Sequence, residues 1–210
     1  MTEAQFGLLT TAFLLVYAAL SPFAGFLADR FNRSRVITGS LFVWSFVTWL
    51  TGYAKTYEQL LATRLLMGIS EACFLPAALA LAADYHRGTT RSLAAGILLG
   101  GVMVGSAMGG LGGWLAERQG WGFAFQLFGL VGIGFGVVLV FLLRDAPRTA
   151  GDDGLPAASA PKVGLGGAMR TLFGSGSFLL AFVYWGLLGV AGWMVIGWMP
   201  TYLQEHFKLT

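Results

Sequence analysis

The feature that most constrains this chain is an uncharged, apolar run from residue 4 to residue 28 that ends abruptly in charge. The next seven residues include Asp29, Arg30, Arg33 and Arg35. A helix of 25 residues is about 37 Å long, enough to cross a hydrocarbon core of about 30 Å. An apolar helix that ends in arginines is typical of a membrane span whose charged end lies in the cytoplasm. The run therefore predicts a transmembrane helix.

The composition of the chain agrees with a lipid environment. Hydrophobic residues make up 56% and charged residues only 11% of the 210 residues, whereas a soluble domain carries about 25% charge. The net charge of +3 lies in loops, which argues against nucleic-acid binding. The single cysteine, Cys73, excludes an internal disulfide and a cysteine-rich metal site. We therefore expect a multi-pass protein of the plasma or inner membrane whose first partner is the lipid bilayer.

Further apolar runs follow the first along the chain. They do not alternate apolar and polar residues as the strands of a membrane barrel do, so the predicted class is an all-α membrane protein. The six predicted spans are residues 4–28, 36–54, 59–83, 91–116, 120–143 and 173–204.

The basic residues in the loops predict the orientation of these spans. Nine lysines and arginines lie in the loops after the first, third and fifth spans, three lie on the opposite side, and Arg64 lies inside a span. Because basic residues gather in cytoplasmic loops, the first set is expected in the cytoplasm and the N-terminus outside.

Residues 144–172 differ from the other connections. They contain Pro147, Pro156 and Pro161, several glycines and alanines, and no apolar period. Such a composition predicts an irregular, flexible linker between separately packed units. We expect three parts: a helical bundle over 1–143, a cytoplasmic linker over 144–172 and a further helical unit over 173–210.

The third span carries charged side chains within an apolar helix. Arg64, Gly68 and Glu71 stand at i, i+4 and i+7, on one stripe of the helix. Glu71 lies near the middle of the span, where a charge is costly and usually faces an internal cavity. One interpretation is a structural ion pair that holds two helices in register. The other is a substrate or coupling site, because a carboxyl between apolar surroundings and an arginine can exchange a proton when those surroundings change.

The stretch from Gly25 to Arg35 has the pattern G-x-L-A-D-R-x-x-R-x-R. It resembles the signature loop of the Major Facilitator Superfamily, which joins the second and third helices of such transporters. In that family the long cytoplasmic loop follows the sixth helix, whereas here it follows the fifth span. The resemblance implies a fragment covering the second to seventh helices. It would be a partial fold with most of the N-terminal half and the first helix of the C-terminal half.

The same resemblance implies a gate at the cytoplasmic helix ends. In the family, charged residues of the following turn join the arginines of the signature loop, although the alternative here is a set of solvated loop charges. Gly25 would allow close helix packing beside them. The gate residues implied are Gly25, Asp29, Arg30, Arg33, Arg35, Asp84 and Arg91.

The run Arg64-x-x-x-Gly68-x-x-Glu71-Ala72, followed by Pro76 and by Ala83-Asp84-Tyr85, resembles the fourth helix of Spinster-like transporters. Members of that group are associated with lysophospholipids and sphingosine phosphate. The final span is equally similar to the seventh helix of anion:cation symporters, which move organic anions such as sugar acids. The implied function is secondary transport of a small organic or lipid-like anionic solute, with Glu71 and Arg64 in proton coupling or substrate binding.

A non-transporting membrane protein, such as a receptor, a scaffold or a membrane-embedded enzyme, is the alternative class. The spans contain no histidine, and one glutamate is poor equipment for catalysis. We therefore expect no enzyme and no cofactor. No ATP-binding motif is present, so transport would draw on an ion gradient, with a proton as the expected ion.

The fourth span is rich in glycine. Gly101, Gly105, Gly109 and Gly110 form small-xxx-small repeats, which predict close helix packing. Their arrangement resembles an antiporter motif of the family in which Ser106 takes the place of the usual proline. Without that proline the helix is not forced to kink. Gly132 to Gly136 in the fifth span lack the spacing of a nucleotide loop and indicate packing instead.

Overall fold

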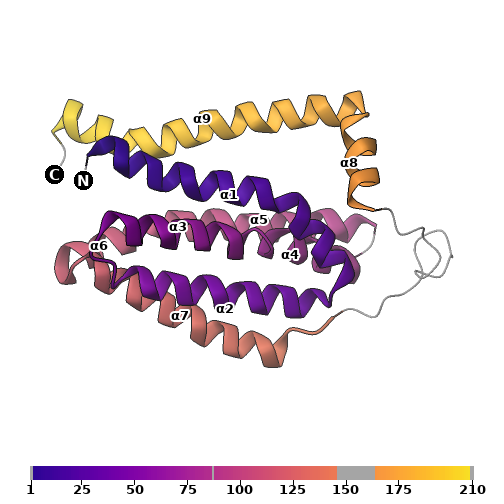
Figure 1. Ribbon diagram of the computed structural model, residues 1–210, viewed down its shortest axis with the longest axis horizontal. Coiled ribbons are helices and arrows are strands. Elements are labelled where there is room, and N and C mark those ends of the chain that lie inside the picture. Colours follow the sequence, from indigo (N-terminus) through magenta and orange to yellow (C-terminus); the bar gives the residue numbers. More distant parts are fainter. Residues whose placement is uncertain (1, 87, 146–163, 209–210) are drawn as a thin grey trace. The chain divides into compact units, whose positions relative to one another are not determined.

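The computed structural model describes residues 2–86, 88–145 and 164–208 (Figure 1). Over these residues the regular structure is helical, and no strand occurs among them. The chain divides into two compact units, Met1–Ala158 and Ser159–Thr210, and each is described by itself.

The first unit contains seven helical segments. Two of them begin with capping boxes, in which Thr2 pairs with Gln5 and Thr56 pairs with Gln59 through side-chain and backbone hydrogen bonds. Gly120, with a φ of +89°, separates the last two segments, a conformation that favours glycine. The segments are α1 (Glu3–Arg30), α2 (Arg33–Thr51), α3 (Tyr57–Glu71), α4 (Phe74–Tyr85), α5 (Thr89–Ala107), α6 (Gly109–Gln119) and α7 (Trp121–Leu142).

Helix α2 lies between α3–α4 and α7 (Figure 1). Its core-facing residues include Ser45 and Thr51, which are 1% and 0% exposed. The Thr51 hydroxyl donates to the Val47 carbonyl (2.8 Å), and the Ser40 hydroxyl donates to the Ser70 carbonyl of α3. Neighbouring helices cover α2, so it tolerates polar residues that a lipid-facing helix would not.

The residue composition of α2 differs from that of the other predicted spans. Among the described residues, five stretches are long and apolar enough to cross a membrane, and α2 is not one of them. It has 19 residues, begins with Arg33 and Arg35, and carries several serines and threonines. The five are Ala4–Ala28, Tyr57–Tyr85, Thr89–Gln119, Trp121–Leu142 and Gly176–Met199.

Two of the predicted spans are interrupted helices. The third breaks at Ala72–Cys73, between α3 and α4. Pro76 has no N–H to offer the Ala72 carbonyl one turn earlier, so a break is expected there. The fourth breaks at Met108, between α5 and α6, where the chain has no proline but runs into the glycines that begin α6.

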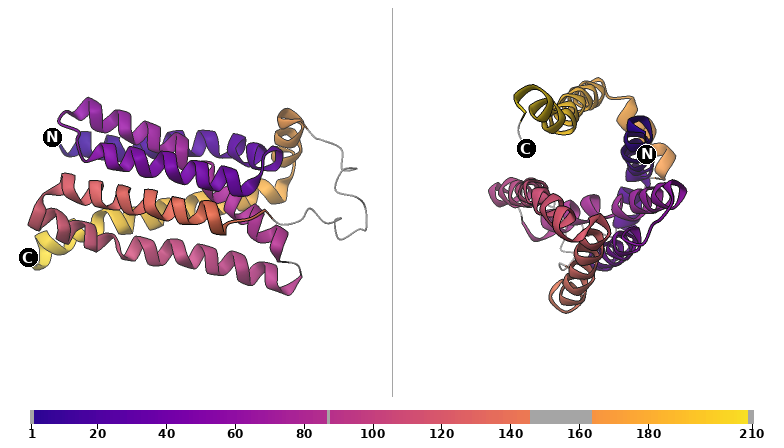
Figure 2. Two further views of the ribbon diagram at one scale, coloured as in Figure 1. Left: turned by 90° about the horizontal axis from the view of Figure 1, so that it is seen from below. Right: turned by 90° about the vertical axis from the view of Figure 1, so that its left-hand side faces the viewer.

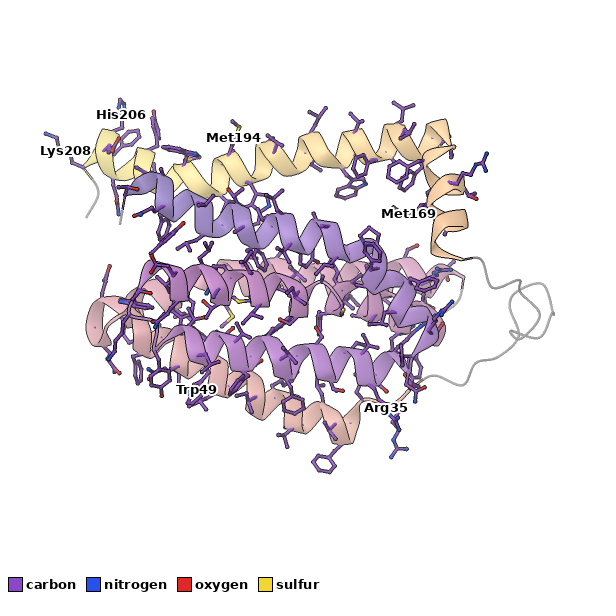
Figure 3. All side chains as sticks on the ribbon, viewed as in Figure 1. Arg35, Trp49, Met169, Met194, His206 and Lys208 are labelled. Atoms are coloured by element: carbon purple, nitrogen blue, oxygen red, sulfur yellow. The ribbon has the colours of Figure 1, made fainter. Side chains whose placement is uncertain are left out.

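A row of glycines brings α7 against α2. A Cβ placed on Gly129 would lie 2.5 Å from the Trp49 amide nitrogen, and one on Gly136 would lie 3.1 Å from the Phe42 ring. Gly132 faces the Ser45 hydroxyl in the same way. Trp49 lies on the side of α2 toward α7 (Figure 3). Gly132 and Gly136 thus pack helix against helix, as the sequence indicates.

The other predicted packing glycines have no such neighbour among the described residues. A Cβ at Gly25 would meet nothing within 4 Å. The close contact at that end of α1 is made instead by Ala28, which is 1% exposed and packs against Ile37, Ala77 and Leu81. The glycines of the fourth span are equally open, so their packing role stays a prediction; these are Gly101, Gly105, Gly109 and Gly110.

The second unit contains α8 (Leu165–Phe173) and α9 (Gly176–Phe207). The prediction that 144–172 is irregular is therefore wrong for α8, on which Met169 lies (Figure 3), and residues 146–163 lie outside the described part. Leu165, Met169 and Leu172 recur at helical spacing, a pattern hidden by the glycines around them. The Phe173 ring then contacts those of Phe178 and Phe182 in α9, at 5.7 and 6.3 Å between centroids.

Candidate functional site

Arg64 and Glu71 lie two turns apart on α3, and both side chains are half-buried. The helical rise separates their Cα atoms by about 10.5 Å, and no ion pair joins the two side chains in the described part of the chain. The two groups nevertheless interact electrostatically. Two opposite charges therefore lie on one stripe of a helix within a candidate membrane span.

The Arg64 guanidinium makes one cation–π contact, and one of its nitrogen atoms is buried without a hydrogen-bond partner in the described part of the chain. It lies 5.3 Å from the centroid of the Phe125 ring of α7. Its Nη2 atom is buried and has no hydrogen-bond acceptor among the described residues. The hydroxyl of Tyr57, seven residues earlier on the same helix, is also buried without a partner. Two polar groups of this kind on one stripe of a helix suit the binding of an anionic group.

Helix α1 approaches α3 most closely beside Glu71. A Cβ on Gly68 would lie 2.8 Å from the Phe13 carbonyl oxygen and 3.3 Å from the Tyr17 amide nitrogen. Gly68 therefore brings α1 and α3 into backbone contact. The Tyr17 phenol is half-buried and lies within electrostatic reach of the Glu71 carboxyl. No sequence pattern distinguishes Tyr17, because a lone tyrosine in an apolar span has the same pattern whether it faces lipid or a binding site.

Glu71 is the last residue of α3, directly before the break. A helix that breaks inside a membrane leaves backbone polar groups to be satisfied by protein or water. Here the backbone of Ala72 and Cys73 keeps right-handed helical angles and Tyr57–Tyr85 remains one candidate span, so the interruption is a local one caused by Pro76. The break and the charge pair thus coincide in one place.

A second cluster joins the ends of α2 and α4. Arg33 forms an ion pair with Asp84, and its Nη1 atom also donates to the Ala80 carbonyl at 2.7 Å. Both side chains are partly buried, which strengthens a charged pair relative to a solvated one. The structure thus brings together two of the residues expected at the cytoplasmic gate.

The end of α7 joins this cluster through residues that sequence reasoning missed. The Ser34 amide in the first turn of α2 donates to the Asp145 carboxylate at 2.8 Å. The Tyr85 hydroxyl at the end of α4 donates to the Arg144 carbonyl at 2.8 Å. Asp145 therefore caps α2 from the segment that follows α7, at a helix N-terminus where the helix dipole favours a carboxylate. No local pattern signals a cap supplied from 111 residues away.

The remaining predicted gate residues do not join this cluster as expected. Arg30, Arg35 and Arg91 are exposed, and none of them pairs with an acidic residue in the described part of the chain. The side chain of Asp29 lies outside the described atoms. Over the same described residues, no group of three His, Cys, Asp or Glu is suited to a metal ion.

Comparison with known proteins identifies relatives of this chain. The family model described as Major Facilitator Superfamily matches residues 1–210. Protein spinster homolog 3 of Danio rerio is 29% identical over 98% of this chain and 42% of its own length. The Probable sulfoacetate transporter of Cupriavidus necator is 28% identical over 98% of this chain and 50% of its own.

A solved structure has the same fold. It is the crystal structure of a bacterial homolog to the human lysosomal transporter Spinster in an inward-facing and unoccupied conformation. The two match with a TM-score of 0.76 and 26% identity over all of this chain and 50% of that one. The chain thus spans about half the length of the proteins that it matches, as a multi-pass, all-helical part of their fold. With the family model matching along its whole length, the chain belongs to the Major Facilitator Superfamily.

Proposed function

We propose that the intact protein is a secondary active transporter that moves a small organic or lipid-like anionic solute by alternating access, with the proton as coupling ion. In this proposal residues 1–143 are an N-terminal helical bundle, and 173–210 contain the first helix of a C-terminal bundle. Residues 144–172 join the two. The similarity to Spinster proteins and to an anion transporter supports the transport class.

The observation that carries the proposal is the unsatisfied Nη2 of Arg64. A buried donor without an acceptor is costly, so water or a ligand is needed to satisfy it, and an anionic ligand satisfies a guanidinium best. Anionic headgroups accept hydrogen bonds from guanidinium in a fork, which neutral solutes do not match. Tyr57, on the same stripe, offers a second hydroxyl. Arg64 would therefore anchor the anionic end of the solute.

Glu71 supplies the group whose charge changes during the cycle. The Glu71 carboxyl interacts electrostatically with the Arg64 guanidinium and with the Tyr17 phenol. Glu71 is also the last residue of α3, directly before the interruption at Ala72–Cys73. Alternating access requires an element that is biased differently in its two states. A carboxyl at a helix break, whose neighbours move when the helices move, meets that requirement.

The ion pair of Arg33 with Asp84 acts in this proposal as part of the cytoplasmic gate. Together with the Asp145 cap it ties the ends of α2, α4 and α7 to one another. Asp29 would complete the gate. The charges would hold that side of the transporter closed in the outward-facing state.

The class of solute follows from the chemistry of Arg64 rather than from size. A sulfonate, a carboxylate and a phosphate all fit a guanidinium, and the relatives include a protein named for sulfoacetate and others named for Spinster. We favour the lipid-like anion, because a further relative of this chain, in Danio rerio, is named as a sphingosine-1-phosphate transporter. The organic-anion symporter is the second candidate, supported by the sulfoacetate relative.

Transport by the reconstituted intact protein tests the proposal. Vesicles would be given sulfoacetate, a hexuronate or lysophosphatidic acid, with and without an imposed pH gradient. We expect one class of anion to cross faster with the gradient than without it. Equal rates with and without the gradient for a transported solute would contradict proton coupling, and no transport of any anion would contradict the solute class.

A further inference from the structure

The three arginines of the loop between α1 and α2 have two different environments. Arg33 points inward, where it pairs with Asp84 and donates to the Ala80 carbonyl. Arg30 and Arg35 are exposed, and neither pairs with an acidic residue among those described. Figure 3 shows Arg35 at the start of α2, with its side chain extending away from the helices. Two of the three cations are therefore available to something outside the protein.

These two arginines line one cavity. It has a volume of about 430 Å³ and lies where α1 ends and α2 begins. It is an open hollow of the protein surface rather than an enclosed cavity. The lining residues are Leu27, Arg30, Phe31, Asn32, Arg35 and Val36.

The lining is divided by chemistry into a cationic part and an apolar part. Arg30 lies over the Phe26 ring, 4.3 Å from its centroid, so its guanidinium is held close to the helix surface rather than free in solvent. Leu27 and Phe31 are 40% and 57% exposed and form an apolar wall beside the two guanidinium groups. Asn32 adds an amide between them. A ligand that matches this lining has an anionic oxygen-rich end joined to an apolar end.

The position of this cavity at the end of a candidate membrane span indicates which of these ligands it binds. It lies at the end of Ala4–Ala28, a candidate membrane span, where headgroups of the bilayer meet the protein. Basic pockets at this depth on the cytoplasmic side suit anionic headgroups. A free phosphate would use the guanidinium groups but would leave the apolar wall exposed to water.

We propose that this cavity binds the headgroup of an anionic phospholipid of the cytoplasmic leaflet, with Arg30 and Arg35 on the phosphate and Leu27 and Phe31 against the start of the acyl chains. The site is separate from Arg64 and Glu71, and it does not rest on the proposed solute or coupling ion. The lipid would occupy the loop that also contains Arg33, which forms the ion pair with Asp84. Lipid composition would thus act on the helix ends that carry this ion pair.

Lipid binding by the intact protein tests this site directly. Purified protein in detergent is titrated with phosphatidylglycerol, and bound lipid is counted by native mass spectrometry. We expect the double variant Arg30→Gln/Arg35→Gln to bind phosphatidylglycerol at least tenfold more weakly than the parent. The variant Arg30→Lys/Arg35→Lys keeps the charge but loses the fork, and its affinity should fall between the two.

The matched control is Arg91→Gln, an exposed arginine at the start of α5 that does not line the cavity. Its affinity for phosphatidylglycerol should stay within twofold of the parent. Phosphatidylcholine should bind the parent and the double variant alike, and glycerol phosphate should not compete. Equal losses for Arg91→Gln and the double variant, full affinity in the double variant, or competition by glycerol phosphate would each overturn the proposal.

Discussion

At the scale of single residues, Arg64 shows how apolar surroundings change the free energy of one unsatisfied N–H group. In water an unmet guanidinium N–H binds solvent at no cost, whereas in apolar surroundings it costs free energy until a partner arrives. The Phe125 ring compensates one face of the group, and Nη2 remains unmet. The residue therefore has more to gain from an anionic ligand than any exposed arginine of the chain.

The variant Arg64→Gln should weaken binding of the transported anion. One charge-assisted hydrogen bond contributes about 1.5 to 3 kcal/mol, so we expect a loss of affinity of roughly 10- to 100-fold. The matched control is Arg118→Gln, because Arg118 is exposed and stacks over Trp114 at 4.3 Å. Equilibrium binding of the solute identified by transport measures both. An equal loss in the two variants would remove Arg64 from the site.

Gly68 is the residue on which the contact of α1 with α3 depends. The variant Gly68→Ala should push the backbone of α1 away, because the added Cβ meets the Phe13 carbonyl rather than a movable side chain. We expect a loss of about 1 to 3 kcal/mol of stability, seen as a lower temperature of thermal unfolding in detergent. Gly39→Ala adds the same methyl to a helix interior with nothing within 4 Å and should be neutral or stabilising. Equal unfolding temperatures for the two variants would contradict a close contact at Gly68.

At the scale of elements, the sequence predicts where helices run better than where they break or touch. Long apolar runs are a property of each segment alone, so α1, α7 and α9 lie close to their predicted spans. The break at Ala72–Cys73 could have been inferred from Pro76, but the break at Met108 has no proline. The cap of Asp145 on α2 depends on how distant helices pack, and a single sequence does not reveal that.

The ion pair between α2 and α4 carries a prediction at this scale. The variant Asp84→Asn removes the ion pair of Asp84 with Arg33, so the cytoplasmic ends of the two helices should part more easily. We expect transport to fall several-fold while expression stays unchanged, and we expect the same of Asp29→Asn. Glu117→Gln, at an exposed acid of α6, is the control and should transport like the parent. Parental transport rates in Asp84→Asn would remove this pair from the gate.

At the scale of the whole molecule, the fold class follows from composition and from the Gly25–Arg35 loop, and the family match along residues 1–210 agrees. Arg64 and Glu71 could be selected because charge is rare in apolar spans. The sequence does not identify Tyr17, Tyr57 and Phe125 as site residues, because aromatic residues are common in such spans. Only the tertiary contacts show which aromatic residues lie near the site. The role of Asp29, whose side chain lies outside the described atoms, stays a prediction.

The orientation of the chain in the membrane can be tested by cysteine labelling. In a Cys73→Ser background, Arg91→Cys should react with an impermeant reagent only from the cytoplasm, and Lys55→Cys only from outside. Both positions are exposed, and nine loop cations against three set this orientation. Figure 2 shows the long helices of the first unit lying along a common direction, so their ends fall on two sides. The reverse labelling pattern would mean that the topology is inverted.

The most direct test of the central claim, that Glu71 couples solute movement to protons, is transport by the reconstituted intact protein with and without a pH gradient. We expect Glu71→Gln to abolish the response of the transport rate to the pH gradient, while exchange of solute across the membrane persists in part. Glu58→Gln, an exposed glutamate at the start of the same helix, should respond like the parent. If Glu71→Gln kept the parental response to the gradient, Glu71 and Arg64 would be a structural charge pair, and the proposed mechanism would be wrong.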